Sequence, residues 1–267
     1  MKTKLFKNNR LIFIMMFLFY ANAIIAQTIV RPEPISGKAM TKSIIQQHLV
    51  YPQNALDNKL NGKITVLFDV DKNGNATNHR VENAFDNECA NEAIHLVKQI
   101  LWKPATNNGL PIDFNHEYTI EFSAKNYLKN IEKNKIKSIP KQDLPADDSY
   151  AIYEYKNLDK TPNPYFNNKN ISFGAYLRSE LKYPDQAKEF EISGTLKLSF
   201  IIETDGKASN IIIENSVGGG CDNEAIRLIQ NLLWTPGIKN DKLVRVKTTQ
   251  EITFQFGERN YHDGNQY

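Results

Sequence analysis

The sequence has few residues of several types that mark common protein classes. It contains two cysteines in 267 residues, Cys89 and Cys221, too few for a disulfide-stapled scaffold of this length. No apolar run reaches the roughly 20 residues that a membrane-spanning helix needs. The five histidines are scattered and show no metal-ligand spacing. Stability must therefore come from apolar cores, and the hydrophobic fraction of 41% is sufficient for packed ones.

Acidic residues are absent before Glu33, and the first 26 residues have the layout of a secretory signal peptide. Basic residues up to Arg10 are followed by an apolar run at 11–20 and by small residues near the end. We expect cleavage near Ala26 or Ala23, with an uncleaved N-terminal anchor as the alternative. These basic residues account for the net charge of +3, so the nearly neutral remainder gives no electrostatic reason to expect nucleic acid as a partner.

An internal repeat with an offset of 132 residues organises the rest of the chain. About 22 of the 72 positions from Tyr51 to Phe122 are identical in this register to those from Tyr183 to Phe254, read without a gap. The shared positions include a Tyr-Pro pair, an Asn-Glu-Ala-Ile run two residues after each cysteine, and a Trp-x-Pro triplet. The chain therefore contains two copies of one module.

Each copy has the pattern of an α-β-β-α-β unit. Apolar residues alternate with period two at 63–70 and 195–202, which predicts strands, and Asn73-Gly74 and Asp205-Gly206 predict tight hairpin turns. Helices are predicted at 41–49 and 172–181 and again at 87–101 and 222–233, and the last strands at 112–122 and 244–256. The prediction is an α+β fold of two tandem modules, each a small antiparallel sheet with two helices packed on one face. Such a short sheet is expected to keep one edge unpaired.

The domain organisation follows from the repeat. We expect a signal peptide or anchor at 1–26, a first domain at 31–123, a linker at 124–157 and a second domain at 158–257. The linker begins basic and rich in asparagine and then becomes acidic, and part of it is expected to be helical.

The joint pattern of motifs resembles a known family. The second copy reads Gly-Gly-Gly-Cys221-Asp-Asn-Glu-Ala, then Trp234-Thr-Pro-Gly, after Tyr183-Pro-x-x-Ala, and the first copy carries the same elements. This combination resembles the C-terminal domain of TonB, the periplasmic energy transducer, and is most similar to TonB-like proteins of Bacteroidetes-type bacteria. The resemblance covers nearly all of the chain after the expected signal peptide.

The resemblance implies a periplasmic protein without a cofactor that grips an extended segment, the TonB box, of outer-membrane TonB-dependent receptors in energy-dependent transmembrane transport. The segment would add as a strand beside the final strand of a copy, which is β-augmentation. Inner-membrane proton-motive motor proteins are further expected partners. The implied partner-binding residues lie on the last strand of each copy or near it: Tyr51, Ile112, Phe114, Tyr118, Ile120, Phe122, Tyr183, Val244, Val246, Ile252 and Phe254.

The chain also departs from a full transducer, which has a long proline-rich spacer. Only about nine residues separate Gln27 from Ile35, a reach of roughly 30 Å. An alternative function is a periplasmic scaffold or envelope assembly protein whose modules pair with each other or with another copy. An exported hydrolase is less favoured, because no nucleophile, base and orienting group recur at paired positions. We therefore expect no enzyme activity.

Two features suggest chemistry but have plainer interpretations. Asp69-x-Asp71-x-Asn73-Gly74 opens like an EF-hand calcium loop, but Arg80 stands where that loop requires a bidentate glutamate, so a hairpin turn is favoured and no metal is expected. Cys89 and Cys221 occupy equivalent positions at a helix start. They are interpreted as small buried packing residues, with a disulfide between the copies as the alternative.

Overall fold

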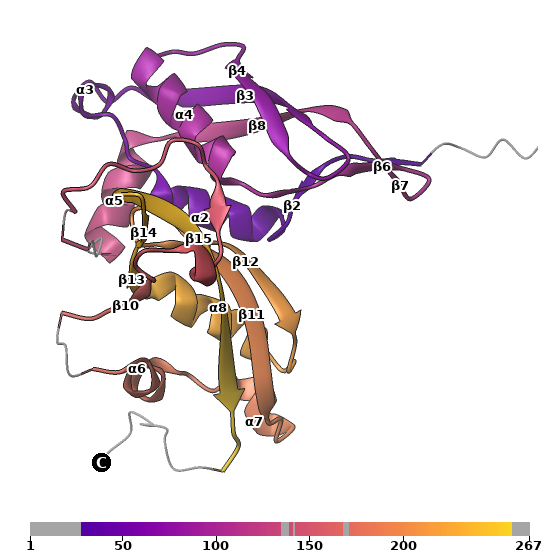
Figure 1. Ribbon diagram of the computed structural model, residues 1–267, viewed down its shortest axis with the longest axis vertical. Coiled ribbons are helices and arrows are strands. Elements are labelled where there is room, and N and C mark those ends of the chain that lie inside the picture. Colours follow the sequence, from indigo (N-terminus) through magenta and orange to yellow (C-terminus); the bar gives the residue numbers. More distant parts are fainter. Residues whose placement is uncertain (1–27, 135–138, 141, 168–170, 258–267) are drawn as a thin grey trace, which may run out of the picture.

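The computed structural model describes residues 28–134, 139–140, 142–167 and 171–257, and the expected signal peptide lies outside them. The first copy packs above the second in Figure 1, with helix α2 between them. Within the described part of the chain, no helix combines the length and hydrophobicity that crossing a membrane requires. Helices and antiparallel strands alternate in each copy, so the α+β prediction is confirmed.

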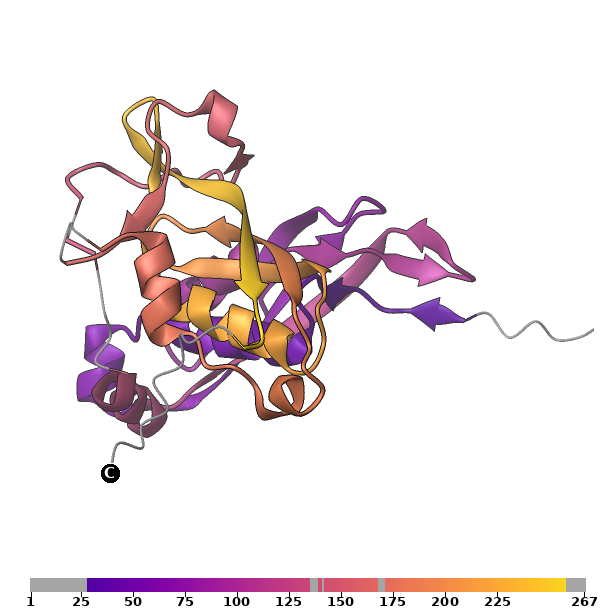
Figure 2. The same cartoon turned by 90° about the horizontal axis from the view of Figure 1, so that it is seen from below.

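The first copy is built on a three-stranded antiparallel sheet in the order β4-β3-β8. Two short strands, β2 (Glu33–Pro34) and β5 (Trp102–Lys103), pair as a separate two-stranded sheet. A separate arm, which projects from the body in Figure 2, consists of β1 (Ile29–Val30), β6 (Ala105–Asn107) and β7 (Leu110–Ile112). The main elements are α2 (Lys38–His48), α3 (Gln53–Asp57), β3 (Gly62–Val70), β4 (Ala76–Val81), α4 (Asn87–Gln99) and β8 (Phe114–Phe122).

The second copy repeats this plan with a larger sheet in the order β12-β11-β15-β14. Its last strand, β15, is continuous, whereas the first copy breaks the equivalent strand at Asp113 into β7 and β8. Two short strands, β10 (Asn163–Tyr165) and β13 (Leu233–Thr235), pair beside the sheet. The main elements are α6 (Phe173–Glu180), α7 (Asp185–Glu189), β11 (Gly194–Ile202), β12 (Ala208–Asn215), α8 (Cys221–Asn231), β14 (Gly237–Lys239) and β15 (Lys242–Phe254).

The hairpin glycines are required by a close backbone contact as well as by their positive φ angles. A Cβ atom on Gly74 would lie 2.3 Å from the carbonyl oxygen of Trp102, and one on Gly206 would lie 2.3 Å from that of Trp234. Real Cβ atoms do not approach backbone that closely, and both φ values are in the range that glycine adopts at no steric cost. Each hairpin therefore packs against the segment that follows α4 in the first copy or α8 in the second.

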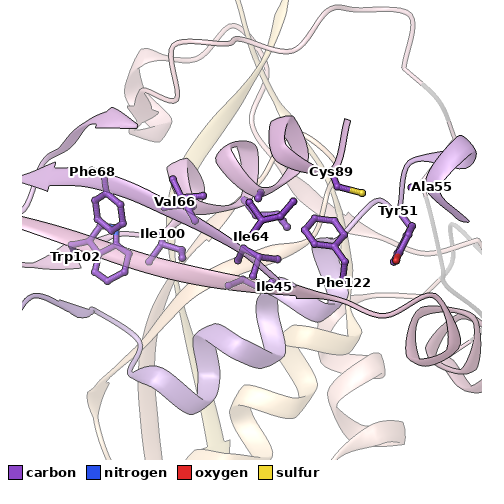
Figure 3. Close-up of a cluster of buried hydrophobic side chains, with 14 of the residues drawn as sticks. Ile45, Tyr51, Ala55, Ile64, Val66, Phe68, Cys89, Ile100, Trp102 and Phe122 are labelled. Carbon is purple, nitrogen blue, oxygen red and sulfur yellow. The ribbon is translucent and has the colours of Figure 1, made fainter. Parts of the chain in front are cut away.

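Each copy has its own hydrophobic core between the sheet and the helices. In the first copy, Phe68 and Trp102 lie at one end of the sheet, and Tyr51 and Phe122 lie at the other (Figure 3). The Phe68 and Trp102 ring centroids are 4.9 Å apart, and the equivalent pair in the second copy is 5.3 Å apart. Both tryptophans are buried, at 4% and 1% exposure.

The two cysteines are free and buried, one in each core. Their interpretation as packing residues is confirmed, and the alternative of a disulfide between the copies is wrong. Burial, together with the neighbouring carboxylate of Asp86, raises the pKa of the Cys89 thiol to about 12. Burial also raises the pKa of Cys221. Neither side chain is therefore a reactive thiolate at neutral pH.

The repeated glutamate after each cysteine is structural. The Glu92 carboxylate accepts a hydrogen bond from the backbone N–H of Val50 at 2.8 Å, and Glu224 accepts one from Lys182 at 2.6 Å. Each glutamate thus holds the residue just before the Tyr-Pro pair against the helix that carries the glutamate, α4 in the first copy and α8 in the second. This contact explains why the same spacing occurs twice.

The two copies meet through polar contacts at the C-terminal end of α4. Asn210, in a left-handed conformation that asparagine tolerates, accepts from the N–H of Leu101 at 2.8 Å and donates to the carbonyl of Gln99 at 2.9 Å. His48 of α2 is buried at the same contact, with its Nε2 3.4 Å from the carbonyl oxygen of Ala208. The second copy therefore satisfies backbone groups that a helix end leaves without partners.

A buried ion pair completes this interface. Arg245 on β15 donates to the Glu203 carboxylate through Nε at 2.7 Å and Nη2 at 2.8 Å, and the two side chains are 4% and 2% exposed. The same Nη2 reaches the Gln99 carbonyl at 2.7 Å. Because a buried charge is costly without partners, this arginine ties β15 firmly to both copies.

The linker is more ordered than its composition indicates. The expected helical part is present as α5 (Ala124–Asn134), which directly follows β8. Further along, the linker forms β9 (Ile152–Tyr153) and a short 3-10 helix, η1 (Tyr155–Asn157). Strand β9 pairs with β15 in parallel, so the linker takes part in the sheet of the second copy.

Candidate functional site

Strand β8 presents an open edge. It pairs with β3 along its whole length, from Phe114 opposite Val70 to Phe122 opposite Gly62. Among the residues that the structure describes, no strand pairs with its other side. A row of backbone N–H and C=O groups is therefore available, and an exposed edge of this kind is a template for pairing with another chain.

Strand β15 is only partly open. Its residues 246–254 pair with β11, and at Val246 the opposite side is occupied by Tyr153 of β9. At Leu243, β14 lies on one side and the linker on the other, where the Leu243 N–H donates to the Pro145 carbonyl at 2.9 Å. Within the described residues, β15 beyond Val246 has no strand on the side opposite β11. The open edge of the second copy is thus confined to residues 247–254.

The linker segment 145–153 is held in place by contacts to both copies. Tyr150, at a φ of 60°, places its hydroxyl 2.7 Å from Nδ1 of His95 and its ring 5.3 Å from the Lys98 ammonium. Its carbonyl accepts from Arg245 at 3.1 Å. A bulky residue in this backbone region is strained and needs support from its surroundings. The segment therefore acts as an internal strand partner clamped against β15.

A groove lies where this internal partner ends. It has a volume of about 580 Å³ and is lined by Glu154, Tyr155, Lys156 and the β15 residues 247–250. The Thr248 hydroxyl donates to the Tyr155 hydroxyl at 2.6 Å across its floor. The groove follows the part of β15 that has no outer strand partner.

The structure brings most of the predicted partner-binding residues onto the two edges. Phe114, Tyr118, Ile120 and Phe122 lie on β8, and Val246, Ile252 and Phe254 lie on β15, all with side chains turned toward the core. Ile112 instead lies on β7 in the arm, opposite Ala105, and Val244 lies on the part of β15 that pairs with β14, opposite Gly237. A role of these residues in partner binding stays a prediction. Their backbone N–H and C=O groups, rather than their side chains, would make the contact.

Tyr51 and Tyr183 are placed differently. Each is 4% exposed and donates its hydroxyl proton to a backbone carbonyl, that of Leu60 or Ile192. The Tyr51 ring packs edge-on against Phe122 at 5.6 Å between centroids. Both tyrosines can influence a bound segment only by fixing the end of the last strand, and direct contact stays a prediction.

Sequence reasoning missed three contributors to these edges: β9, Tyr150 and Arg245. A signal existed for β9, because Ile152 and Tyr153 are strand-forming residues within an acidic, polar stretch. Arg245 gave a weaker signal as a charge within an apolar strand pattern. The Asp69 and Asp71 carboxylates are engaged by asparagine side chains and turn N–H groups, and among the described residues no cluster of three or more potential metal ligands occurs.

A small α+β module whose final strand leaves one edge without a strand partner offers a template for pairing with an extended chain. The chain belongs to the family of Gram-negative bacterial TonB protein C-terminal domains, whose model matches residues 47–124 and 179–256. The two matched ranges fall on the two copies and cover more than half of the chain, which confirms the resemblance. No individual curated protein matches the chain.

Family membership implies a TonB-like role in energy-coupled transport and a location in the cell envelope. The family's domain is a non-catalytic interaction module that generally engages outer-membrane TonB-dependent receptors.

Proposed function

We propose that this protein binds extended segments of outer-membrane TonB-dependent receptors by strand addition, mainly along β8 and secondarily along β15 beyond Val246. The observation that supports the proposal is the outer side of β8, which has no strand partner among the described residues over nine residues. Main-chain hydrogen bonds along this edge would supply affinity, and alternate side chains of the guest would supply specificity.

Export through the N-terminal segment is part of this proposal, with cleavage near Ala26 or Ala23 and a periplasmic location. Contact with inner-membrane proton-motive motor proteins would require the anchor to remain attached. Two sites on one chain would also allow bivalent binding, since two linked modules can bind far more tightly than one.

The proposal is tested by NMR titration of the isotope-labelled full chain with receptor N-terminal peptides. We expect the largest changes in the backbone amide signals of β8, with smaller ones at 247–254. The matched control is the same peptide N-methylated at the alternate residues whose N–H groups would face β8, which removes the donors along that edge without altering the protein. Strand addition predicts that this control does not bind. Binding that survives N-methylation, or no binding by any receptor segment, would contradict the proposal.

The scaffold alternative can be compared with the observed packing. The two copies contact each other through α2, α4 and β12, and β8 does not pair with β15 in the described residues. Edge pairing between the copies of one chain is therefore not favoured. Pairing of β8 with a second chain is the remaining form of the alternative, and a mass above that of the monomer in light scattering would support it.

A further inference from the structure

The solvent face of β8 carries two glutamates four residues apart. The exposed positions are Asn115, Glu117, Thr119 and Glu121, alternating with residues turned toward the core. A guest strand beside β8 would place its own outward side chains about 4.5–5.5 Å from these residues, the spacing of directly opposed pairs in a sheet. Residues i and i+4 of the guest would then neighbour Glu117 and Glu121.

These two carboxylates are poorly neutralised by the rest of the sheet. On β3, Lys63 is directly opposite Glu121, but the residue opposite Glu117 is the apolar Leu67. Within the described residues, neither glutamate has a cationic partner within 4 Å. A cation on the guest strand would therefore meet an unpaired charge, above all at Glu117.

The other charges of this face lie on the inner and far strands. Asp69 on β3 is half-buried, and hydrogen bonds from Asn78 and Asn115 hold the pKa of its carboxyl below the usual value, so it stays ionised. Arg80 is on β4, two strands from the open edge and opposite Leu67. Since strands are about 4.8 Å apart, Arg80 is roughly 10 Å from β8 and is screened by solvent.

The second copy differs at both positions. Thr249 and Thr253 stand where the first copy has Glu117 and Glu121. Its charged residues on the same face, Lys247 and Glu251, have opposite signs. Two edges with the same backbone therefore offer different charges to a guest.

The core face of β8 completes the recognition surface. Phe114, His116 and Tyr118 are only half-buried on that face, so a guest strand could cover their exposed parts. Apolar inward side chains on the guest would gain from this burial.

We propose that the β8 edge selects an extended segment in which inward apolar side chains alternate with outward ones, with lysine or arginine at outward positions four residues apart. The inference rests on the proposed function, because it specifies the guest for the same edge. The second copy, with threonines at the equivalent positions, would show little preference for such cations.

The test uses three synthetic nine-residue peptides with the same inward valines. The two outward positions that neighbour Glu117 and Glu121 carry lysine, serine or glutamate. Each peptide is titrated into the labelled full chain, and affinity is read from the β8 amide signals. We expect the lysine peptide to bind about threefold to tenfold more tightly than the glutamate peptide, since two cross-strand charge pairs are involved. The preference should shrink in 0.5 M salt, because these charges are exposed.

The duplication supplies a matched variant. Glu117→Thr combined with Glu121→Thr gives the first copy the residues that the second copy already carries in the same fold. We expect this variant to bind all three peptides alike while its β8 signals still respond. If the wild-type chain binds the three peptides equally, or if the variant keeps the preference, the charge selectivity is wrong and strand addition stands. If none of the three peptides binds while a receptor peptide does, the inferred guest pattern is wrong, and if receptor peptides fail as well, both proposals fall.

Discussion

The same strand has different surroundings in the two copies. Among the described residues, no strand lies on the outer side of β8 in the first copy, whereas in the second copy the linker closes the start of β15. The two strands occupy equivalent parts of the repeat, but one aligned position differs. Asp113, just before β8, is exposed, and Arg245, within β15, is buried against Glu203 and the linker. Duplication thus preserved the fold while a few residues changed which part of each edge is accessible.

The copies also differ in what surrounds the phenylalanine of the first long strand. Phe68 lies between two imidazole rings, His79 at 5.4 Å and His116 at 5.5 Å between centroids. The corresponding neighbours of Phe200 are Ile211 and Thr248. Only the first of these two sites contains groups that titrate near neutral pH.

The largest effect is expected from removing the buried arginine. Arg245→Ala should lower the free energy of unfolding by about 3–5 kcal/mol, because Glu203 would remain buried without its partner. Asp113→Ala at the equivalent exposed position should cost less than about 1 kcal/mol. Urea denaturation followed by tryptophan fluorescence measures both. An equal loss of unfolding free energy in the two variants would show that the buried ion pair contributes no more to stability than the exposed Asp113 does.

A smaller effect is expected from releasing the linker. Tyr150→Ala removes the ring from His95 and Lys98, which should speed hydrogen exchange at the Leu243 amide and extend guest binding toward the start of β15. The loss of stability should be about 1 kcal/mol. Tyr150→Phe is the matched control, since it keeps the ring and loses only the hydroxyl contact. Unchanged exchange at Leu243 in the alanine variant would contradict a clamping role.

The smallest effect concerns pH. Burial lowers the pKa of His79 and of His116, so folding favours their neutral forms. Above the unfolded pKa of about 6.5, the histidines are neutral in both states and do not oppose folding. As the pH falls below that value, the unfolded state binds protons first, so the folded state loses stability until the pH has passed the lower folded pKa values. We expect acidification from pH 7.5 to 5 to lower the unfolding temperature of the wild type.

The repeat again provides the control for this pH prediction. The double variant His79→Ile and His116→Thr carries the residues of the second copy and should lose part of the pH dependence in thermal unfolding, while His95, whose pKa burial also lowers, keeps its share. A variant as acid-sensitive as the wild type would place the responsible groups elsewhere.

Much of the module could be predicted from the sequence, because its signals are local and occur twice. The alternation of apolar and polar residues at 63–70 predicted one strand, and the hairpin glycine predicted the turn that follows it. Helix boundaries deviated by one to three residues: α4 ends at Gln99, where the prediction extended it to Leu101. The short helices α3 and α7 were not predicted, since five residues after a proline carry no helical period.

The accessible surface was harder to predict. Strand β9 has two residues, and its partner lies about 90 positions away, so no periodicity could reveal the pairing. The contact of Asn210 with the end of α4 depends on how two folded units meet, which local patterns do not encode. By contrast, the role of Glu92 and Glu224 could have been suspected, because a charged residue kept at the same place in both copies requires a shared contact.

Asn210 also has a consequence for bivalent engagement. Because its side chain hydrogen-bonds the backbone at the end of α4 in the other copy, the two modules pack as one unit rather than as two flexibly linked domains. The separation and orientation of their open edges are then fixed by the fold. Only a partner whose two extended stretches match that fixed spacing could occupy both edges simultaneously.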